Sequence, residues 1–250
     1  MTDKVKKAAP VIWEGIQKSK NVLLHCHPSP DPDSIGSALA MMHILKTLGK
    51  NPTVIMGDSA PPSSFKILPG SEKIELINFF QVNLSKFDTF IILDTSSPEQ
   101  ISKKGPVDLP KTLNTIIIDH HKSNKEFAKI NLVDTNYPAV CQIIYDLLKE
   151  WKIEISPDVA LCLFTGIYTD TGGFQYQPTD SSTFSAASEL VKINPNFSQA
   201  IFELENNNEP GQIFYKGLAL SSLELYFNKQ LALSAVPYEE LQKKGVNKRH

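Results

Sequence analysis

The chain of 250 residues is 41% hydrophobic, 21% charged and 9% aromatic, a composition typical of soluble globular proteins. Its length allows one domain or two, since domains commonly contain ~100–200 residues. The net charge is −2, with 25 Lys and Arg against 27 Asp and Glu, which argues against a protein that wraps long nucleic acid by neutralising phosphates. A short or small phosphorylated substrate stays compatible with this charge.

Targeting and redox features are sparse. No apolar run approaches the ~20 residues that cross a bilayer, and the opening Met-Thr-Asp-Lys-Val-Lys-Lys does not resemble a secretory signal. The cysteines at 26, 141 and 162 have no CxxC spacing, so neither a disulfide framework nor a thiolate zinc site is expected. We expect a cytoplasmic protein with no membrane partner.

The first 190 or so residues alternate apolar runs with segments of helical period, which predicts an α/β sheet with crossover helices. The predicted strands cover residues 21–25, 52–56, 89–93 and 115–118. The predicted helices cover residues 5–17, 34–48, 139–151, 157–168 and 181–191. The breaker-rich segment 206–211 indicates a boundary. Beyond it, two strands are predicted over 223–227 and 230–236.

Acids and histidines follow the predicted strands. The first strand runs into His25-Cys-His27-Pro-Ser-Pro-Asp31-Pro-Asp33, the run 89–93 into Asp94, and the run 115–118 into Asp119-His120-His121. A further acid, Asp170, follows the helix 157–168 and precedes two glycines. Because loops after the carboxyl ends of parallel strands gather at one edge of a sheet, where ligands bind, these side chains are expected to meet.

Each of these residues alone has a plain structural explanation, as a turn former, a helix cap, a helix end or a packed polar side chain. Together they are harder to explain, because crowded carboxylates repel unless they are protonated or bridged by cations. Oxygen and imidazole ligands without thiolate suit Mn²⁺, Mg²⁺ or a similar ion. Six ligands suit two ions that share a carboxylate, an arrangement used for phosphoryl hydrolysis.

The segment from His27 to Ser37, the strand-terminal Asp94, Asp119-His120-His121 and Asp170-Thr-Gly resemble, in order and spacing, the four motifs of DHH phosphoesterases. They look most like the DHH/DHHA1 branch, which includes NrnA-like oligoribonucleases and pAp phosphatases. The resemblance implies a parallel-sheet DHH domain with flanking helices over residues 1–194 and a helical linker over 195–221. Residues 222–250 then resemble the start of an incomplete DHHA1-like α/β domain, and the family's Gly-Gly-His loop has no counterpart.

The resemblance also implies roles. The residues implied to hold two divalent ions, with Mn²⁺ expected and Mg²⁺ the alternative, are His27, Asp31, Asp33, Asp94, His120 and Asp170. Of these, Asp94 would bridge the ions. Asp119 would orient a ligand histidine, and His121 would face the scissile phosphate as a donor to its oxygens or to the leaving group. Ser37, at the start of the first crossover helix, is a candidate substrate contact or simply part of a helix start. His25 is expected to be structural.

Two glutamines depart from the pattern, since Gln100 and Gln175 stand where many relatives have Arg, which leaves the substrate open. The leading hypothesis is two-metal hydrolysis of short oligonucleotides or of nucleotides such as pAp. The alternatives are a cyclic or linear dinucleotide phosphodiesterase, a pyrophosphatase-like hydrolase, and a nucleotide-binding module without turnover. A homodimer is possible for this family.

Overall fold

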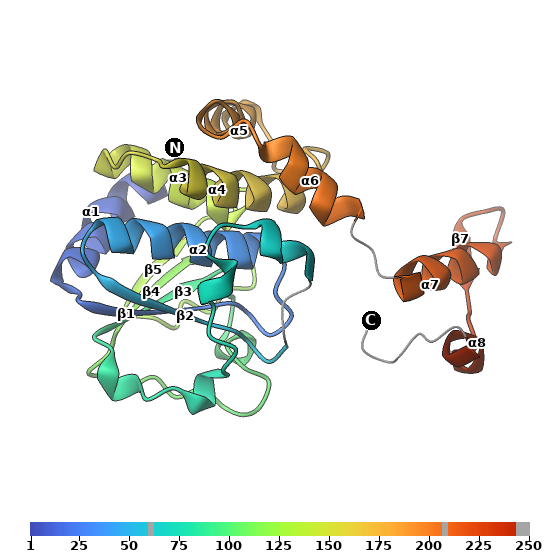
Figure 1. Cartoon of the computed structure of the whole chain (residues 1–250), viewed down its shortest axis with the longest axis horizontal. Coiled ribbons are helices and arrows are strands. Elements are labelled where there is room, and N and C mark those ends of the chain that lie inside the picture. Colours follow the sequence, from blue (N-terminus) through green and yellow to red (C-terminus); the bar gives the residue numbers. More distant parts are fainter. Residues whose placement is uncertain (60–62, 207–209, 244–250) are drawn as a thin grey trace. The chain divides into compact units, whose positions relative to one another are not determined.

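The computed structural model describes residues 1–59, 63–206 and 210–243 (Figure 1). The chain divides into two compact units, Met1–Ile201 and Phe202–His250. Parts of the predicted boundary segment, of the predicted linker and of the predicted DHHA1-like segment, namely residues 207–209 and 244–250, lie outside the described residues. Within the described ranges, no helix combines the length and apolar character needed to span a membrane.

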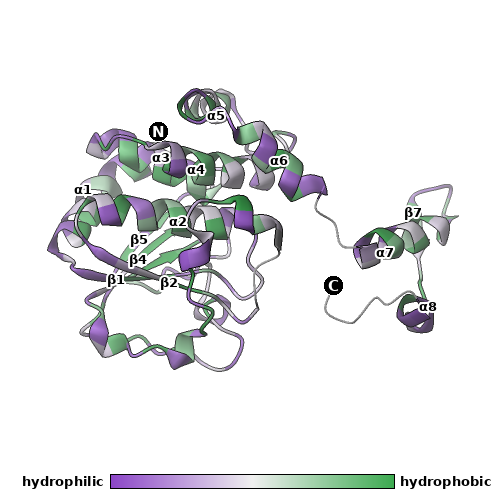
Figure 2. Ribbon diagram, viewed as in Figure 1, coloured by the Kyte–Doolittle hydropathy of each residue, from purple (hydrophilic) through white to green (hydrophobic). Residues whose placement is uncertain are grey.

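The first unit is built on a five-stranded sheet in the order β2-β1-β3-β4-β5, with every neighbouring pair parallel. Its strands are β1 (Asn21–His25), β2 (Asn51–Ile55), β3 (Thr89–Leu93), β4 (Asn114–Asp119) and β5 (Ile130–Val133). The central strand β3 is buried along its whole length, as expected for a strand covered on both faces, and Figure 2 shows the hydrophobic character of the central strands. The predicted α/β class is therefore confirmed.

Helices α1 (Asp3–Lys18), α2 (Pro32–Thr47) and α3 (Val140–Trp151) cover one face of the sheet. The chain continues with α4 (Pro157–Asp170), α5 (Ser181–Ile193) and α6 (Phe197–Asn206). Helices α1, α2 and α3 contact strands, whereas α4 packs on α2 and α3, and α5 packs on α4 (Figure 1). Asp31 caps α2 by accepting a hydrogen bond from the Ser34 N–H at 2.9 Å, and Pro32 occupies the first turn, where its missing N–H does no harm.

The other face of the sheet is covered by irregular chain with the short 3₁₀ turns Phe79–Gln81, Leu84–Lys86 and Pro98–Gln100. These segments seal an apolar cluster made of Leu23, Ile55, Phe79, Phe90, Ile92, Ile101, Leu113 and Ile117. Two earlier 3₁₀ turns, Ser63–Ile67 and Ser71–Lys73, flank Pro69 and Gly70 and lie beside α2 on the helical side (Figure 1). Both faces of the sheet are therefore buried, which leaves the ends of its strands as the place for a site.

Two glycines let α2 and α4 approach closely. A Cβ added at Gly36 of α2 would lie 2.6 Å from the backbone oxygen of Cys162. A Cβ added at Gly166 of α4 would lie 2.3 Å from Cys141 Sγ and 2.6 Å from Asp33 Oδ1. Because α2 begins and α4 ends at the same edge of the sheet, this approach helps to set where Asp33 and Asp170 lie.

The second unit contains α7 (Pro210–Ser221), β6 (Leu223–Tyr226), β7 (Leu231–Ser234) and α8 (Tyr238–Lys243). Strands β6 and β7 form an antiparallel hairpin that pairs Leu223 with Ser234 and Tyr226 with Leu231. These strands fall within the two predicted ones but are shorter, because residues 227–229 adopt positive φ angles in the turn.

Candidate metal centre

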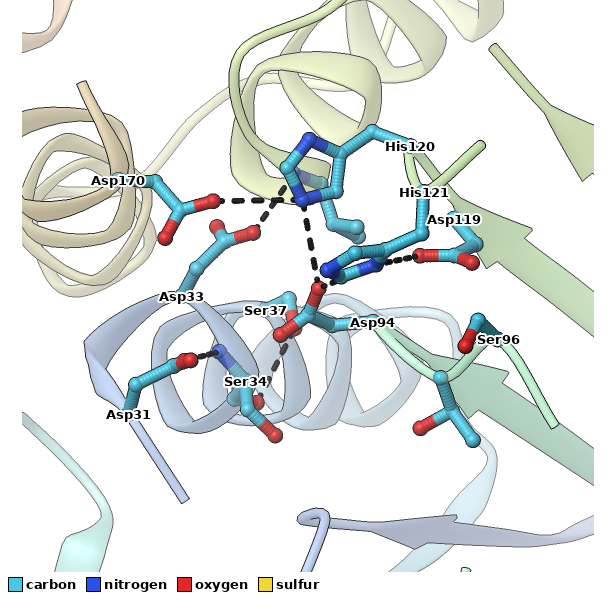
Figure 3. Close-up of polar contacts among 12 residues, drawn as sticks. Asp31, Asp33, Ser34, Ser37, Asp94, Ser96, Asp119, His120, His121 and Asp170 are labelled. Carbon is cyan, nitrogen blue, oxygen red and sulfur yellow. Dashed lines mark hydrogen bonds and ion pairs between the residues drawn. The ribbon is translucent and has the colours of Figure 1, made fainter. Parts of the chain in front are cut away.

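The strand order places the candidate site at a topological switch point. Strands β1 and β3 are neighbours, whereas the chain passes from β1 through α2 to β2 on the outer side. In open parallel sheets, ligands bind outside the carboxyl ends of the strands at such a point. His27 follows β1, Asp94 follows β3 and Asp119 ends β4. Figure 3 shows Asp94 between the side chains of α2, of the Asp-His-His segment and of Asp170.

The first group of candidate ligands consists of His27, Asp31 and Asp94, whose nearest ligand atoms all lie within 4.8 Å of one another. His27 Nε2 lies 3.2 Å from Asp31 Oδ2 and 3.6 Å from Asp94 Oδ2. The other oxygen of Asp31 caps α2, so the helix start fixes this carboxylate. The carboxylates outweigh the effect of burial and raise the pKa of His27.

The second group consists of Asp33, His120 and Asp170, again within 4.8 Å of one another. His120 Nε2 lies 3.3 Å from Asp170 Oδ2. Asp33 is fully buried and accepts hydrogen bonds from the backbone N–H groups of Val140 at 2.7 Å and Cys141 at 3.0 Å. These N–H groups open α3, where the helix dipole favours a negative charge.

Asp94 belongs to both parts of the site. Its Oδ1 lies 3.5 Å from His120 Nε2, while its Oδ2 faces His27. The residue has a φ of +51°, a left-handed conformation that Asp tolerates better than most residues. Within the described part of the chain, Asp94 Oδ1 and His120 Nε2 are buried without a hydrogen-bond partner. A cation among these atoms would satisfy both, and the oxygen and imidazole donors fit Mn²⁺ or Mg²⁺.

The charges of this cluster are unbalanced without a cation. Burial, together with the charge of Asp94, raises the pKa of Asp33 to about 7. Burial and the charges of Asp33 and Asp94 raise the pKa of Asp170 to about 8. Burial lowers the pKa of His120, but contacts with these three carboxylates outweigh it and raise that pKa to about 10. The cluster therefore retains protons that a bound cation would displace.

Asp119 and His121 form a hydrogen-bonded pair at the edge of the cluster, where His121 Nδ1 also lies 3.6 Å from Asp94 Oδ1. Asp119 is fully buried, and its Oδ1 lies 2.8 Å from His121 Nδ1. The resemblance implies that Asp119 orients a ligand histidine, whereas the structure places it on His121; His120 Nδ1 lies instead 3.2 Å from the Tyr137 carbonyl oxygen. A further grouping of nearby ligand atoms joins this pair to Asp94 and His120.

Sequence reasoning missed Asn124. Its Nδ2 donates hydrogen bonds to Asp119 Oδ2 at 2.6 Å and to the Thr95 carbonyl at 3.1 Å. Its neighbours in the sequence, Ser123 and Lys125, suggest only a polar turn. The usable signal is its place in the loop that directly follows the Asp-His-His segment.

Ser37, His25 and Gln100 are held by local contacts. Ser37 is fully buried, and its hydroxyl donates to the Ser34 carbonyl at 3.1 Å within α2, so its contact with substrate stays a prediction. His25 is buried edge-on against Phe90, with 5.4 Å between ring centroids. Gln100 Oε1 accepts hydrogen bonds from the N–H and hydroxyl of Ser96 at 2.8 and 3.0 Å, which closes the turn after Asp94.

A parallel sheet with carboxylates and imidazoles gathered at its carboxyl edge defines an α/β protein with a candidate metal site. Residues 21–167 match the N-terminal domain of the DHH family, so this chain belongs to the DHH family. The sequence resemblance is thereby confirmed.

Similar proteins extend the family match. The chain is 27% identical to the bifunctional oligoribonuclease and PAP phosphatase NrnA of Thermus thermophilus, over 91% of this chain and 69% of that protein. It is 30% identical to the cyclic-di-AMP phosphodiesterase GdpP of Bacillus subtilis, over 71% of this chain and 28% of that protein. The chain thus spans only part of the length of these relatives.

Solved structures show the same fold. An exopolyphosphatase-related protein from Bacteroides fragilis is 25% identical with a TM-score of 0.87, covering 98% of this chain and 73% of that one. A putative family II inorganic pyrophosphatase from Methanococcus jannaschii is 20% identical with a TM-score of 0.58, covering 90% of this chain and 75% of that one.

Proposed function

We propose that this protein is a two-metal phosphoesterase that hydrolyses short oligonucleotides or nucleotide phosphates such as pAp. The observation that carries the proposal is the pair of ligand groups, His27, Asp31 and Asp94 on one side and Asp33, His120 and Asp170 on the other, linked by the two oxygens of Asp94. Mn²⁺ is the proposed ion, with Mg²⁺ as the alternative. The names of NrnA-type relatives support the substrate class.

The chain's own residues would orient the substrate around this centre. Two divalent ions, when bound, would activate a water for attack and would stabilise the negative charge that develops on the phosphate. His121 is 43% exposed in its side chain, against 17% for His27 and 15% for His120. Because Asp119 engages its Nδ1, Nε2 is the nitrogen left to donate to the phosphate oxygens or to the leaving group.

The organisation inferred from the sequence belongs to this proposal. It comprises a DHH domain over residues 1–194, a helical linker over 195–221 and the beginning of a DHHA1-like domain over 222–250. We further propose a cytoplasmic location, as for enzymes of nucleotide turnover, and a possible homodimer.

Hydrolysis assays with Mn²⁺ test the proposal. The wild-type chain is expected to hydrolyse pAp or a diribonucleotide, to lose activity in EDTA and to regain it with added Mn²⁺. The Asp94→Asn variant should lose at least about 100-fold, more than is typical for residues that only support ligands. Asp108→Asn, which changes an exposed acid outside the site, is the matched control and should keep its activity.

Parallel substrates separate the alternatives. Cyclic di-AMP and pyrophosphate are assayed beside the nucleotides, because one relative is named as a cyclic-di-AMP phosphodiesterase. Turnover of pyrophosphate but of no nucleotide would replace the proposal with a pyrophosphatase-like activity. Nucleotide binding without any product would favour a binding module, and an Asp94→Asn variant as active as wild type would refute the two-metal centre.

A further inference from the structure

The side chain of Asn124 forms hydrogen bonds next to the site with both its amino group and its oxygen. Its Nδ2 donates to Asp119 Oδ2 and to the Thr95 carbonyl, at 2.6 and 3.1 Å. Its Oδ1 accepts a hydrogen bond from the Glu126 N–H at 2.6 Å. One amide thus joins the segment after β3, which carries Asp94, to the end of β4, which carries Asp119.

The contact acts on Asp119, which in turn acts on His121. The Asp119 carboxylate is buried, with Oδ1 on His121 Nδ1 at 2.8 Å and Oδ2 on the Asn124 amide. Loss of the amide donor would remove a side-chain partner from a buried carboxylate, which is costly, and would leave its two oxygens free to exchange places. The angle at which His121 is held would then no longer be fixed.

A role in closing the loop accounts for only part of this geometry. The hydrogen bond that Asn124 Oδ1 accepts from the Glu126 N–H closes a turn of the kind that Asn commonly forms. The two donor contacts reach residues that lie 5 and 29 positions away in the sequence, and one of them ends on the carboxylate that holds His121. Histidines held in this way by a buried acid serve in general acid–base catalysis.

We propose that Asn124 is a positioning residue that, through Asp119, holds His121 so that Nε2 protonates the leaving oxygen of the substrate. The inference rests on the proposed phosphoesterase function. In the step, a water oxygen forms a new bond to phosphorus and the bond from phosphorus to the leaving nucleoside oxygen breaks. The proton on His121 Nε2 passes to that leaving oxygen, and the proton lost by water goes to solvent.

Asn124→Asp is the sharpest variant because it keeps the size and the acceptor oxygen toward Glu126 while replacing the donor with an oxygen. Asn131→Asp is the matched control. Asn131 also closes a loop, accepting from the Ala128 N–H at 3.1 Å and donating to the Ala128 carbonyl at 2.8 Å, so both of these side-chain contacts are local. Asn124→Ala gives a second variant in case the carboxylate pair prevents folding, and circular dichroism checks each one.

The test compares two leaving groups in the presence of Mn²⁺. A diribonucleotide releases an alkoxide that needs a proton, whereas the p-nitrophenyl ester of a nucleotide releases a stable p-nitrophenolate. Asn124→Asp is expected to lower kcat for the diribonucleotide by about 10–100-fold, the usual effect of supporting residues. KM and the rate with the p-nitrophenyl ester should stay close to wild type, and Asn131→Asp should match wild type on both substrates.

The outcomes distinguish a failure of the role assigned to Asn124 from a failure of the proposed phosphoesterase function. An equal loss on both substrates, or no loss on either, would overturn the role assigned to Asn124. A wild-type chain that hydrolyses neither substrate would instead overturn the proposed function, whatever the variants do.

Discussion

The close approach of α2 and α4 makes Gly166 a sensitive position. A Cβ there would lie 2.3 Å from Cys141 Sγ, 3.0 Å from Cys141 Cβ and 2.6 Å from Asp33 Oδ1. Carbon atoms pack best at about 3.5–4.0 Å. To restore that spacing around the new Cβ of Gly166→Ala, α3, α4 or the Asp33 side chain would have to move away by about 1 Å.

Two opposing effects set the magnitude. Replacing Gly by Ala inside a helix stabilises it by about 0.5–1 kcal/mol, because Ala loses less backbone entropy. Overpacking a well-filled core costs about 1–3 kcal/mol. We expect the cost of overpacking to exceed the gain in helix stability, with a net decrease of about 1–2 kcal/mol in the free energy of unfolding of the first unit. Because Asp33 lies at the point of contact, Mn²⁺ affinity should fall in the same variant.

Tryptophan fluorescence during urea unfolding measures this effect. The chain has two Trp residues, and Trp13 and Trp151 lie in the first unit with ring centroids 5.3 Å apart. The control is Gly217→Ala in α7, since no described atom lies within 4 Å of the added Cβ; it should leave the Trp transition unchanged. A Gly166→Ala variant as stable as wild type, with undiminished Mn²⁺ affinity, would refute the close approach.

Two further predictions concern the charges of the site. The metal-free protein should lose stability from pH 6 to pH 9, because the folded state holds protons on Asp33, Asp170 and His120 that the unfolded state has released. Thermal unfolding in EDTA measures this loss as a fall in the unfolding temperature. An unfolding temperature that rises over this pH range would argue against these pKa shifts. Calorimetry in buffers of different ionisation enthalpy should show more protons released by Mn²⁺ binding at pH 6 than at pH 9, and equal release would count against metal binding at these acids.

The sheet was largely predictable because its central strands are buried on both faces. An unbroken apolar run such as β3 has bounds that are visible in the sequence, and the acid that follows it is then placed at the sheet edge. Strand β5 was missed because it is a short edge strand with one buried residue, Leu132. Without a buried face, Ile130–Val133 carries no periodic signal.

The gathering of these acids and histidines at one edge of the sheet was predictable, whereas their contacts with one another were not. Asp33 and Asp170 meet because Gly36 and Gly166 let two helices approach, a tertiary fact that neither helix shows in its own sequence. The preference of Asp119 for His121 depends on side-chain rotamers. These features arise from packing between distant segments, so local patterns do not encode them.

The most direct test of the two-metal centre is anomalous X-ray scattering from crystals of the chain grown with Mn²⁺. A two-metal centre predicts two peaks about 3.5–4 Å apart, one beside His27 and Asp31 and the other beside Asp33, His120 and Asp170, with Asp94 between them. Peaks that lie away from Asp94, or none at this edge of the sheet at saturating Mn²⁺, would contradict a two-metal centre shared through this carboxylate.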